Sequence, residues 1–506
     1  MKKGLLKFAY LLVASFCFTN FLFTDHLGIN LPLTEVIILA GLVIFNRVNL
    51  HRTSLYYLFA WLLSGLAVVF IHTNLAIWMN ILFFLICCSQ LLWSEIKHPL
   101  FSLWMWFLNL YRAQQHQWVR FAQYRGQKGR GARFLKTLPL MAIILAIVVV
   151  FILLYNYSSS DFQNSMSWLG EGLNNFFTFL VGDLTFWKLQ FFVLGFTLIA
   201  GLMLRTTSLR GLVRVNKQPS QLMRVRRTRS SENLTLGLKK ERNFGIILLG
   251  LLNLVIFLLN ILDIKNIWIN FTWDGGVLKQ FVHEGTYMLI LSIFISAVIA
   301  LVLFRRNQNF YNNNKWLRDL TYIWLLQNAL LTMSVGMRNY WYIKYFNLAY
   351  LRIGVIIFLI LVLVGLLLVA YKVWKRQTGI SVFGKGLHIS LFILLCCSFV
   401  NWDKVIVNHN LEHADTAFFH RDFMVTLPDN TLATLKANEA LFDVPDSTDS
   451  VNCYTREYFG WSETERTYSE WLRIRYTTFT RDWESRNWRT WNYPEAEAYQ
   501  ELKLME

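Results

Sequence analysis

The chain has 506 residues, of which 55% are hydrophobic and only 16% charged, and its mean hydropathy is +0.38. A soluble domain is usually about 45–50% apolar and roughly 25% charged. The excess apolar residues fall in blocks of about 20, the length that crosses a bilayer as a helix. This composition excludes a soluble enzyme, a disordered chain and a collagen-like or disulfide-stapled protein. It predicts an all-α, polytopic integral membrane protein.

The formal net charge of +18 is unevenly distributed along the chain. Residues 402–506 contain 11 Lys and Arg against 19 Asp and Glu, a net charge of −8, so residues 1–401 carry a net charge of +26. The positive charge lies in loops between apolar blocks, which favours cytoplasmic loops that face a bilayer with anionic headgroups. No nucleic-acid-binding motif accompanies these loops, and we expect no nucleic-acid partner.

The apolar blocks predict eleven transmembrane helices. The first follows Met1, Lys2 and Lys3, as in a signal peptide, but its apolar run is long and no small-x-small cleavage pattern comes after it. We therefore expect it to be retained as a span. In chain order the predicted spans are 5–23, 28–46, 54–72, 74–93, 137–155, 184–204, 244–264, 286–304, 319–336, 351–370 and 387–406.

These spans predict an organisation in six segments. They are an N-terminal four-span bundle (1–93), a cytoplasmic interfacial helix with a basic loop (94–136), a two-span unit (137–204), a basic cytoplasmic loop (205–243), a five-span core (244–406) and an outer, Trp-rich, helical tail (407–506). In the tail one helical face is predicted by the spacing of Tyr468, Leu472, Tyr476, Phe479 and Trp483.

The orientation follows from the distribution of Lys and Arg between alternate loops. With the N-terminus inside, the inner segments hold 31 Lys and Arg, and the outer loops 24–27, 156–183, 265–285 and 337–350 hold 4. One missed span would scramble this asymmetry, so it supports both the number of spans and the orientation. The acidic tail is then expected outside, which in a double-membrane bacterium is the periplasm, and the protein is predicted to reside in the bacterial inner membrane.

The basic loop 205–243 contains four arginines within six residues, Arg224, Arg226, Arg227 and Arg229. Such clusters usually act through the surface potential of the inner leaflet. Contact with lipid headgroups is the first interpretation, and a docking site for an acidic cytoplasmic protein is the second. The tail 407–506 is the other candidate surface for a protein partner.

His409, Glu412 and His413 match the H-x-x-E-H order of inverted zinc peptidases. On a helix the two histidines are one turn apart and could share a metal ion. The pattern is short, and the tail is too small for the usual peptidase fold. We therefore expect a solvated pair of histidines just outside the membrane and no cofactor.

Polar side chains gather at the outer ends of predicted spans seven to ten. Ionisable groups at this depth are costly unless they are paired, so they form either a structural ion-pair network or a working site for protons or a ligand. Glu35, Gln327 and Asn328, also within spans, are expected to form interhelical hydrogen bonds. The cluster comprises Asn253, Asn260, Asp263, His283, Glu284, Arg338, Lys344 and Arg352.

Part of the chain resembles the bacterial multi-spanning proteins grouped as domain of unknown function 4173. The resemblance rests on elements in a fixed order within about 240–440: Leu252-Asn253 with Asp263, Phe281–Gly285, Arg338, Tyr345–Gly354, and Asn401-Trp402-Asp403 before Asn410-Leu411. It implies an integral membrane protein without an assigned activity, so it transfers no catalytic residue. It adds Asp403 to the polar cluster and does not require His409 or His413.

Three functions remain open at this level. The first is a non-enzymatic signalling or scaffold protein that contacts partners on both membrane faces. The second is a transporter or channel that uses the polar cluster, although no proline breaks a predicted span at its centre. The third is a membrane metalloenzyme at His409 and His413.

Overall fold

The computed structural model describes residues 2–24, 26–46, 50–96, 98–124, 186–205, 219–224, 237–271, 277–444 and 467–505, with the single residues 48, 144 and 148. In this part of the chain all regular structure is helical, and one isolated β-bridge joins Gln221 and Gln377. The all-α prediction is confirmed. The chain forms two compact units, Met1–Lys217 with Ser485–Ala496, and Gln218–Glu484 with Glu497–Glu506.

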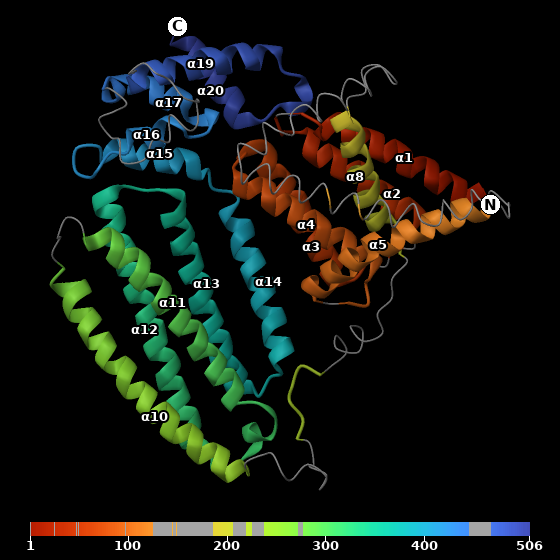
Figure 1. Ribbon diagram of the computed structural model, residues 1–506. Coiled ribbons are helices and arrows are strands. Elements are labelled where there is room, and N and C mark those ends of the chain that lie inside the picture. The colour runs from red at the N-terminus through yellow and green to blue at the C-terminus, as the bar shows by residue number, and fades with distance from the viewer. Residues whose placement is uncertain are drawn as a thin grey trace. The chain divides into compact units, whose positions relative to one another are not determined.

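The first unit is built on a helical hairpin. A three-residue connection joins α3 to α4, and Thr73 caps α4 by accepting a hydrogen bond from the backbone N–H of Ala76. The sequence predicted these two helices at 54–72 and 74–93, and the structure agrees within two residues. The helices of this unit are α1 (Lys2–Leu22), α2 (Asn30–Phe45), α3 (Arg52–Phe70), α4 (Asn74–Leu92), α5 (Pro99–Tyr124) and α8 (Phe186–Met203) (Figure 1).

Helix α5 covers much of the predicted interfacial segment and packs one face against its own unit. Ser102, Met105, Asn109 and Ala113 recur at helical spacing and are each 1% exposed or less. The Asn109 side-chain amide donates to the carbonyl oxygens of Gly201, at 2.8 Å, and Leu204, at 2.5 Å. The buried face of α5 is thus joined to the end of α8. The basic residues 125–136 lie outside the described residues, as does nearly all of predicted span 137–155.

A C-terminal segment also belongs to the first unit. The backbone N–H of Ile29 donates to the carbonyl oxygen of Trp491 at 3.1 Å. A Cβ atom at Gly28 would lie 2.4 Å from the Thr490 carbonyl oxygen, so this close approach requires glycine. The part of the predicted tail from Ser485 to Ala496 therefore packs with the connection between α1 and α2.

The second unit contains the predicted five-span core as long helices that lie side by side (Figure 1). Helices α10 and α12 are parallel neighbours with α11 between them in the chain. A buried apolar core that includes Leu249, Ile293, Leu317 and Val373 joins these helices to α13. The elements are α10 (Leu238–Asp263), a π-helix (Ile264–Ile269), α11 (Val277–Leu303), a 3₁₀ helix (Arg306–Phe310), α12 (Lys315–Phe346), α13 (Tyr350–Lys375) and α14 (Gly379–Cys397).

The position of the last predicted span is corrected by the structure. The prediction was 387–406, whereas α14 begins at Gly379 and ends at Cys397. Lys385 is tolerated within the helix because its ammonium group reaches Gln377 Oε1 at 2.8 Å. The chain breaks after α14 because the Asn401 side chain caps a new helix by accepting from the Lys404 N–H.

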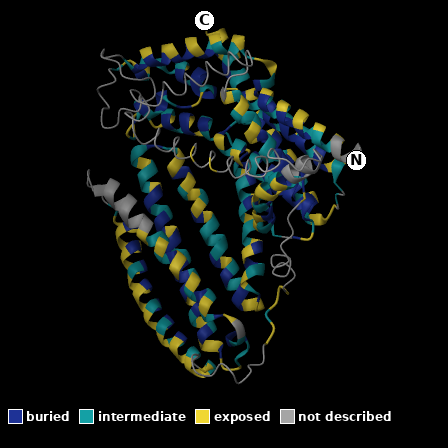
Figure 2. Cartoon of the chain, turned by 45° about the vertical axis from the view of Figure 1, so that its right-hand side comes forward, coloured by how far each residue is buried: buried dark blue, intermediate teal, exposed yellow. Residues whose placement is uncertain are grey.

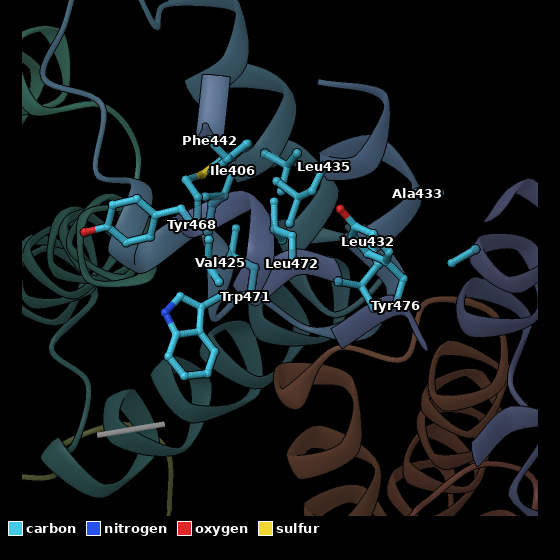
Figure 3. Close-up of a cluster of buried hydrophobic side chains, with 14 of the residues drawn as sticks. Ile406, Val425, Leu432, Ala433, Leu435, Phe442, Tyr468, Trp471, Leu472 and Tyr476 are labelled. Atoms are coloured by element: carbon cyan, nitrogen blue, oxygen red, sulfur yellow. The ribbon is translucent and has the colours of Figure 1, made fainter. Parts of the chain in front are cut away.

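The remaining tail residues of the second unit form a small domain with its own core. Figure 3 shows Tyr468, Trp471, Leu472 and Tyr476 of α19 packed beside side chains of the shorter tail helices. The predicted face is confirmed, with Trp483 only partly buried. The elements are α15 (Trp402–Glu412), α16 (Arg421–Val425), a 3₁₀ helix (Asp429–Thr431), α17 (Leu432–Ala437), a 3₁₀ helix (Glu439–Phe442) and α19 (Tyr468–Ser485). The 3₁₀ helix Trp488–Thr490 and the start of α20 (Tyr493–Leu504) belong to the first unit, and α20 belongs to the second unit from Glu497 onward.

Among the described residues, five helices are long and apolar enough to cross a membrane: Arg52–Phe70, Asn74–Leu92, Leu238–Ile269, Tyr350–Lys375 and Gly379–Cys397. The most apolar 18-residue stretch of α10 and the π-helix has a mean hydropathy of 2.6, yet only 28% of that stretch is buried inside the protein. Figure 2 shows exposed residues recurring along the long helices of this unit. Exposed apolar surface of this extent marks contact with another apolar phase, which suits a membrane protein. Eleven spans, their orientation and the six-segment organisation stay predictions.

The packing of α10 against its neighbours can be tested with two glycines of the same helix. A Cβ atom at buried Gly245 would lie 2.8 Å from Leu317 Cδ1 and 3.2 Å from Leu303 Cδ2, whereas one at exposed Gly250 meets nothing within 4 Å. Gly245→Val is expected to lower stability by about 1–3 kcal/mol more than Gly250→Val, because the buried Leu317 cannot move aside. Thermal unfolding of the purified protein in detergent measures the difference. Equal effects of the two substitutions would contradict this packing.

Candidate functional site

Helices α10 and α12 are joined by a series of polar contacts. The Asn253 amide donates to the Leu320 carbonyl oxygen at 3.1 Å, and its Oδ1 accepts from Gln327 Nε2 at 2.8 Å. Two helical turns further along α10, Asn260 Nδ2 donates to the Gln327 carbonyl oxygen at 3.1 Å. All three side chains are buried. Amide side chains between two apolar helices form hydrogen bonds with one another in this way, because an apolar environment offers few other partners.

The same series ends in a buried ion pair. Arg338 Nη2 donates to Asp263 Oδ1 at 2.7 Å, and Ser334 Oγ donates to Asp263 Oδ2 at 2.6 Å. Only 7% of the Arg338 side chain and 9% of the Asp263 side chain are exposed. Both carboxylate oxygens therefore accept a hydrogen bond from α12, which is the arrangement that a desolvated charge requires.

A last contact lies beyond the ion pair, in the π-helix. Trp341 Nε1 donates to the Ile267 carbonyl oxygen at 2.9 Å, and the Trp341 ring stacks on Phe271 with the ring centroids 4.8 Å apart. Ile267 lies in the last turn before the π-helix ends at Ile269, where carbonyl groups lack an intrahelical donor, so its carbonyl is available to an indole N–H. We call the contacts of Asn253, Asn260, Asp263 and Ile267 with Leu320, Gln327, Ser334, Arg338 and Trp341 the α10–α12 polar ladder.

The ladder has a seven-residue repeat on both helices. Positions 253, 260 and 267 of the α10 segment meet positions 320, 327 and 341 of α12, and position 334 of α12 binds Asp263. A seven-residue repeat keeps one seam of each helix facing its partner over several turns. The numbers rise together on both helices, so the two helices run parallel.

Arg352 belongs to a different arrangement, at the corner between α12 and α13. Its guanidinium donates to the carbonyl oxygens of Phe346, at 2.6 Å, and Asn347. Asn347 ends α12 in the left-handed region with φ of 66°. The guanidinium also lies 4.3 Å from the centroid of the Tyr342 ring. A cation at a helix C-terminus stabilises the exposed carbonyl groups there.

Asp403 lies in a third arrangement, where the tail meets α13. Its Oδ1 accepts from the Tyr350 hydroxyl at 2.6 Å, and its Oδ2 accepts from Asn430 Nδ2 at 3.1 Å. Beside it, Asn410 Oδ1 accepts from the Leu348 N–H at 2.8 Å, and Asn410 Nδ2 donates to the Leu348 carbonyl oxygen at 3.0 Å. These four contacts hold the tail domain on the start of α13.

The predicted polar cluster thus separates into parts. Four of its members, Asn253, Asn260, Asp263 and Arg338, lie in the ladder, while Arg352 and Asp403 lie elsewhere. Lys344 is exposed and its ammonium group lies 5.0 Å from the Trp341 ring centroid. The side chains of His283 and Glu284 lie outside the described residues, and so do Arg226, Arg227 and Arg229, whereas Arg224 is exposed.

The two histidines of the zinc motif stack on each other. Their ring centroids are 4.3 Å apart, and His413 Nδ1 donates to the His409 carbonyl oxygen at 2.8 Å. Among the described residues no group of three or more His, Cys, Asp or Glu side chains is placed to hold a metal ion. Burial lowers the pKa of His409 from its usual 6.5, the neighbouring His413 lowers it further, and Glu412 acts in the opposite direction.

Of the other polar residues within predicted spans, Glu35 and Gln327 form the expected interhelical bonds and Asn328 does not. In the first unit, Trp61 Nε1 of α3 donates to Glu35 Oε2 of α2 at 2.7 Å, and Glu35 is only 3% exposed. Gln327 joins the ladder, whereas the Asn328 amide donates within its own helix to the Trp324 carbonyl oxygen. Sequence reasoning missed Ser334 and Trp341, although their seven-residue spacing from Gln327 was a usable signal, and it named Asn410 only among the residues of the family resemblance.

The all-helical fold, the apolar helices and the buried interhelical polar contacts together have the character of a helical membrane protein. Residues 36–437 match the family described as Domain of unknown function (DUF4153), so the chain belongs to that family. The resemblance to an uncharacterised family is therefore confirmed, but the matching family is DUF4153, and the more specific assignment to domain of unknown function 4173 is not supported. Searches of curated proteins and of solved structures gave no match.

The ion pair of the ladder can be tested by a double-mutant cycle. Asp263→Leu or Arg338→Met alone leaves one buried charge without its partner, and each is expected to cost about 3–5 kcal/mol. The double variant is expected to recover a large part of that loss. Chemical unfolding in detergent measures the coupling. The surface pair Arg473 and Glu439, 3.8 Å apart, serves as a control with an expected coupling energy of less than about 1 kcal/mol. Additive losses in the double variant would contradict the pairing.

The lowered pKa of His409 predicts a pH dependence of stability. The folded protein favours the neutral imidazole, so the unfolded state binds more protons as the pH falls. The contribution of His409 is present above about pH 6.5 and is lost as the pH falls through the folded pKa. Unfolding midpoints between pH 7.5 and pH 5 measure it. The loss should be smaller in His409→Gln, and an identical pH profile in that variant would refute the assignment.

Proposed function

We propose that this protein is a non-enzymatic scaffold or signalling component of a bacterial inner membrane. In this proposal the chain crosses the bilayer eleven times with its N-terminus inside, and the helical tail lies in the periplasm. The loop 205–243 and the tail then offer one contact surface on each side. The observation that carries the proposal is a folded tail domain attached to a transmembrane helix through buried, directional hydrogen bonds.

The attachment is tight enough to hold the tail in one orientation. Ile353 near the start of α13 is part of the same buried core as Ile406, Leu432 and Leu472 of the tail. The contacts of Asp403 and Asn410 add directional bonds at this point. A long linker would serve if the tail were merely tethered, whereas a shared core sets its orientation relative to the helices of the second unit.

The tail is also rigid within itself. Arg475 of α19 is 6% exposed and donates to the carbonyl oxygens of Val425 and, at 2.7 Å, of Leu427. Its other nitrogen binds Asp429 Oδ1 at 2.5 Å. One guanidinium thus ties α19 to the segment between α16 and α17. The opposite face of α19, with Arg473, Thr477 and Arg481, is exposed and is the surface that we assign to a protein partner.

Transport has less support, because the ladder residues are committed to one another. The Asp263 carboxylate accepts from both Arg338 and Ser334, and the Asn253 and Asn260 amides bind α12. A transport site needs groups that exchange these partners for a substrate. A metal-dependent reaction has still less support, because His409 and His413 have no third ligand among the described side chains.

The scaffold proposal predicts a tail-dependent cross-link in cells. A photo-reactive amino acid at Thr477, which is exposed on α19, is expected to give one discrete adduct with a second protein. The adduct should disappear in Asn410→Leu, because that change leaves the Leu348 N–H and carbonyl groups unpaired and releases the tail. It should persist in Asn408→Leu, an exposed position of the same helix. Adducts with lipid alone, or an adduct unaffected by Asn410→Leu, would refute the proposal.

A further inference from the structure

We propose that the groove between α10 and α11 binds one anionic phospholipid, with an acyl chain along the groove and the phosphate at the basic end of the two helices. The site lies in the second unit and goes beyond the scaffold function. It is distinct from the general attraction between basic loops and anionic headgroups, because it needs a shaped groove and particular side chains.

The groove has a volume of about 360 Å³, within the range of ligand pockets. Phe244 and Leu248 line it from α10, and Ile295, Val298 and Val302 are among the residues that line it from α11. Every lining residue is apolar, and the lining extends from Leu291 to Leu303, which is about 18 Å of helix. A long, dry and open groove of this kind suits a hydrocarbon chain.

The two helices are antiparallel here, which brings the start of α10 beside the end of α11. A Cβ atom at Gly245 would lie 3.2 Å from Leu303 Cδ2, so the start of α10 and the end of α11 are in contact at this level. Lys240 lies one helical turn before Phe244, on the stripe that continues to Leu248. Arg305 follows the last lining residue of α11 by two positions.

The basic end has free charge for a phosphate. Lys239, Lys240 and Arg305 are exposed, and no described acidic side chain forms an ion pair with them. Arg242, by contrast, is already engaged, because it donates to the Asn313 carbonyl oxygen at 3.3 Å. Gly237 precedes α10 without a side-chain cap, so the first N–H groups of the helix remain to be satisfied. A phosphate is a favourable acceptor at such a helix start.

The occupant is a phospholipid because the apolar and the basic parts are continuous. A free phosphate would use the basic end and leave the groove empty, and an uncharged lipid would use the groove and ignore the cations. Helix α10 also exposes apolar side chains outside the groove, among them Ile247 at 64% and Leu251 at 62%, so the groove opens where bulk lipid is expected. An anionic phospholipid matches all of these features.

The test is native mass spectrometry of the delipidated full-length protein in detergent. It is titrated with phosphatidylglycerol, with phosphatidylcholine of the same acyl chains, and with glycerol 3-phosphate. The wild type is expected to retain one phosphatidylglycerol at least tenfold more tightly than phosphatidylcholine. Displacement of the lipid by equimolar glycerol 3-phosphate would overturn the proposal in favour of a free phosphate site.

Paired variants separate the two halves of the site. Val298→Trp fills the groove and is expected to weaken phosphatidylglycerol binding tenfold or more, whereas Ile247→Trp, on the outer face of α10, should not. The double variant Lys240→Gln with Arg305→Gln keeps the groove and should lose the preference for phosphatidylglycerol. Lys315→Gln, an exposed lysine at the start of α12, is its control. Equal phosphatidylglycerol binding in all four variants would overturn the proposal. If Val298→Trp fails to fold, the double variant Lys240→Gln with Arg305→Gln still tests it.

Discussion

The need to pair polar groups inside apolar helices governs the second unit of this protein. Asp263 and Arg338 are almost fully buried and satisfy each other across α10 and α12, with Ser334 occupying the second carboxylate oxygen. A buried charge without a partner is far more costly than the pair itself is stabilising. The pair therefore acts mainly on register: sliding one helix by a turn would break the ion pair and both amide contacts together.

From this register the rest of the unit follows in order. Parallel α10 and α12 require α11 to run the opposite way, and Lys372 of α13 binds the Leu301 and Phe304 carbonyl oxygens at the end of α11. Arg352 then closes the corner after α12, where Asn347 reverses the chain. The tail is built on that corner through Asn410 and Leu348. A perturbation of the tail would thus reach the helices through the start of α13.

The outward surfaces have a different physical role. Most of the apolar side chains of α10 point away from the protein, so hydration would be very unfavourable and a bilayer is the natural surroundings. The core of the tail buries several aromatic residues instead, among them Trp471 at 4% exposed, whereas Trp488 is 64% exposed. The outer face of α19 is polar. The exposed apolar surface and the surface that we propose for a protein partner thus lie on different elements of one chain.

The sequence by itself determined the helical class and most helix positions, because apolar blocks and helical periodicity are local properties. It also identified Asp263 and Arg338 as members of one cluster, since charges at that depth need partners. Only the tertiary structure decided that Arg352 and Asp403 leave this cluster. Their partners are backbone carbonyls, a Tyr350 hydroxyl and Asn430, which carry no charge pattern in the sequence. The end of α14 was misplaced for a similar reason: hydropathy continues past Cys397, and the Asn401 cap that starts α15 depends on local geometry.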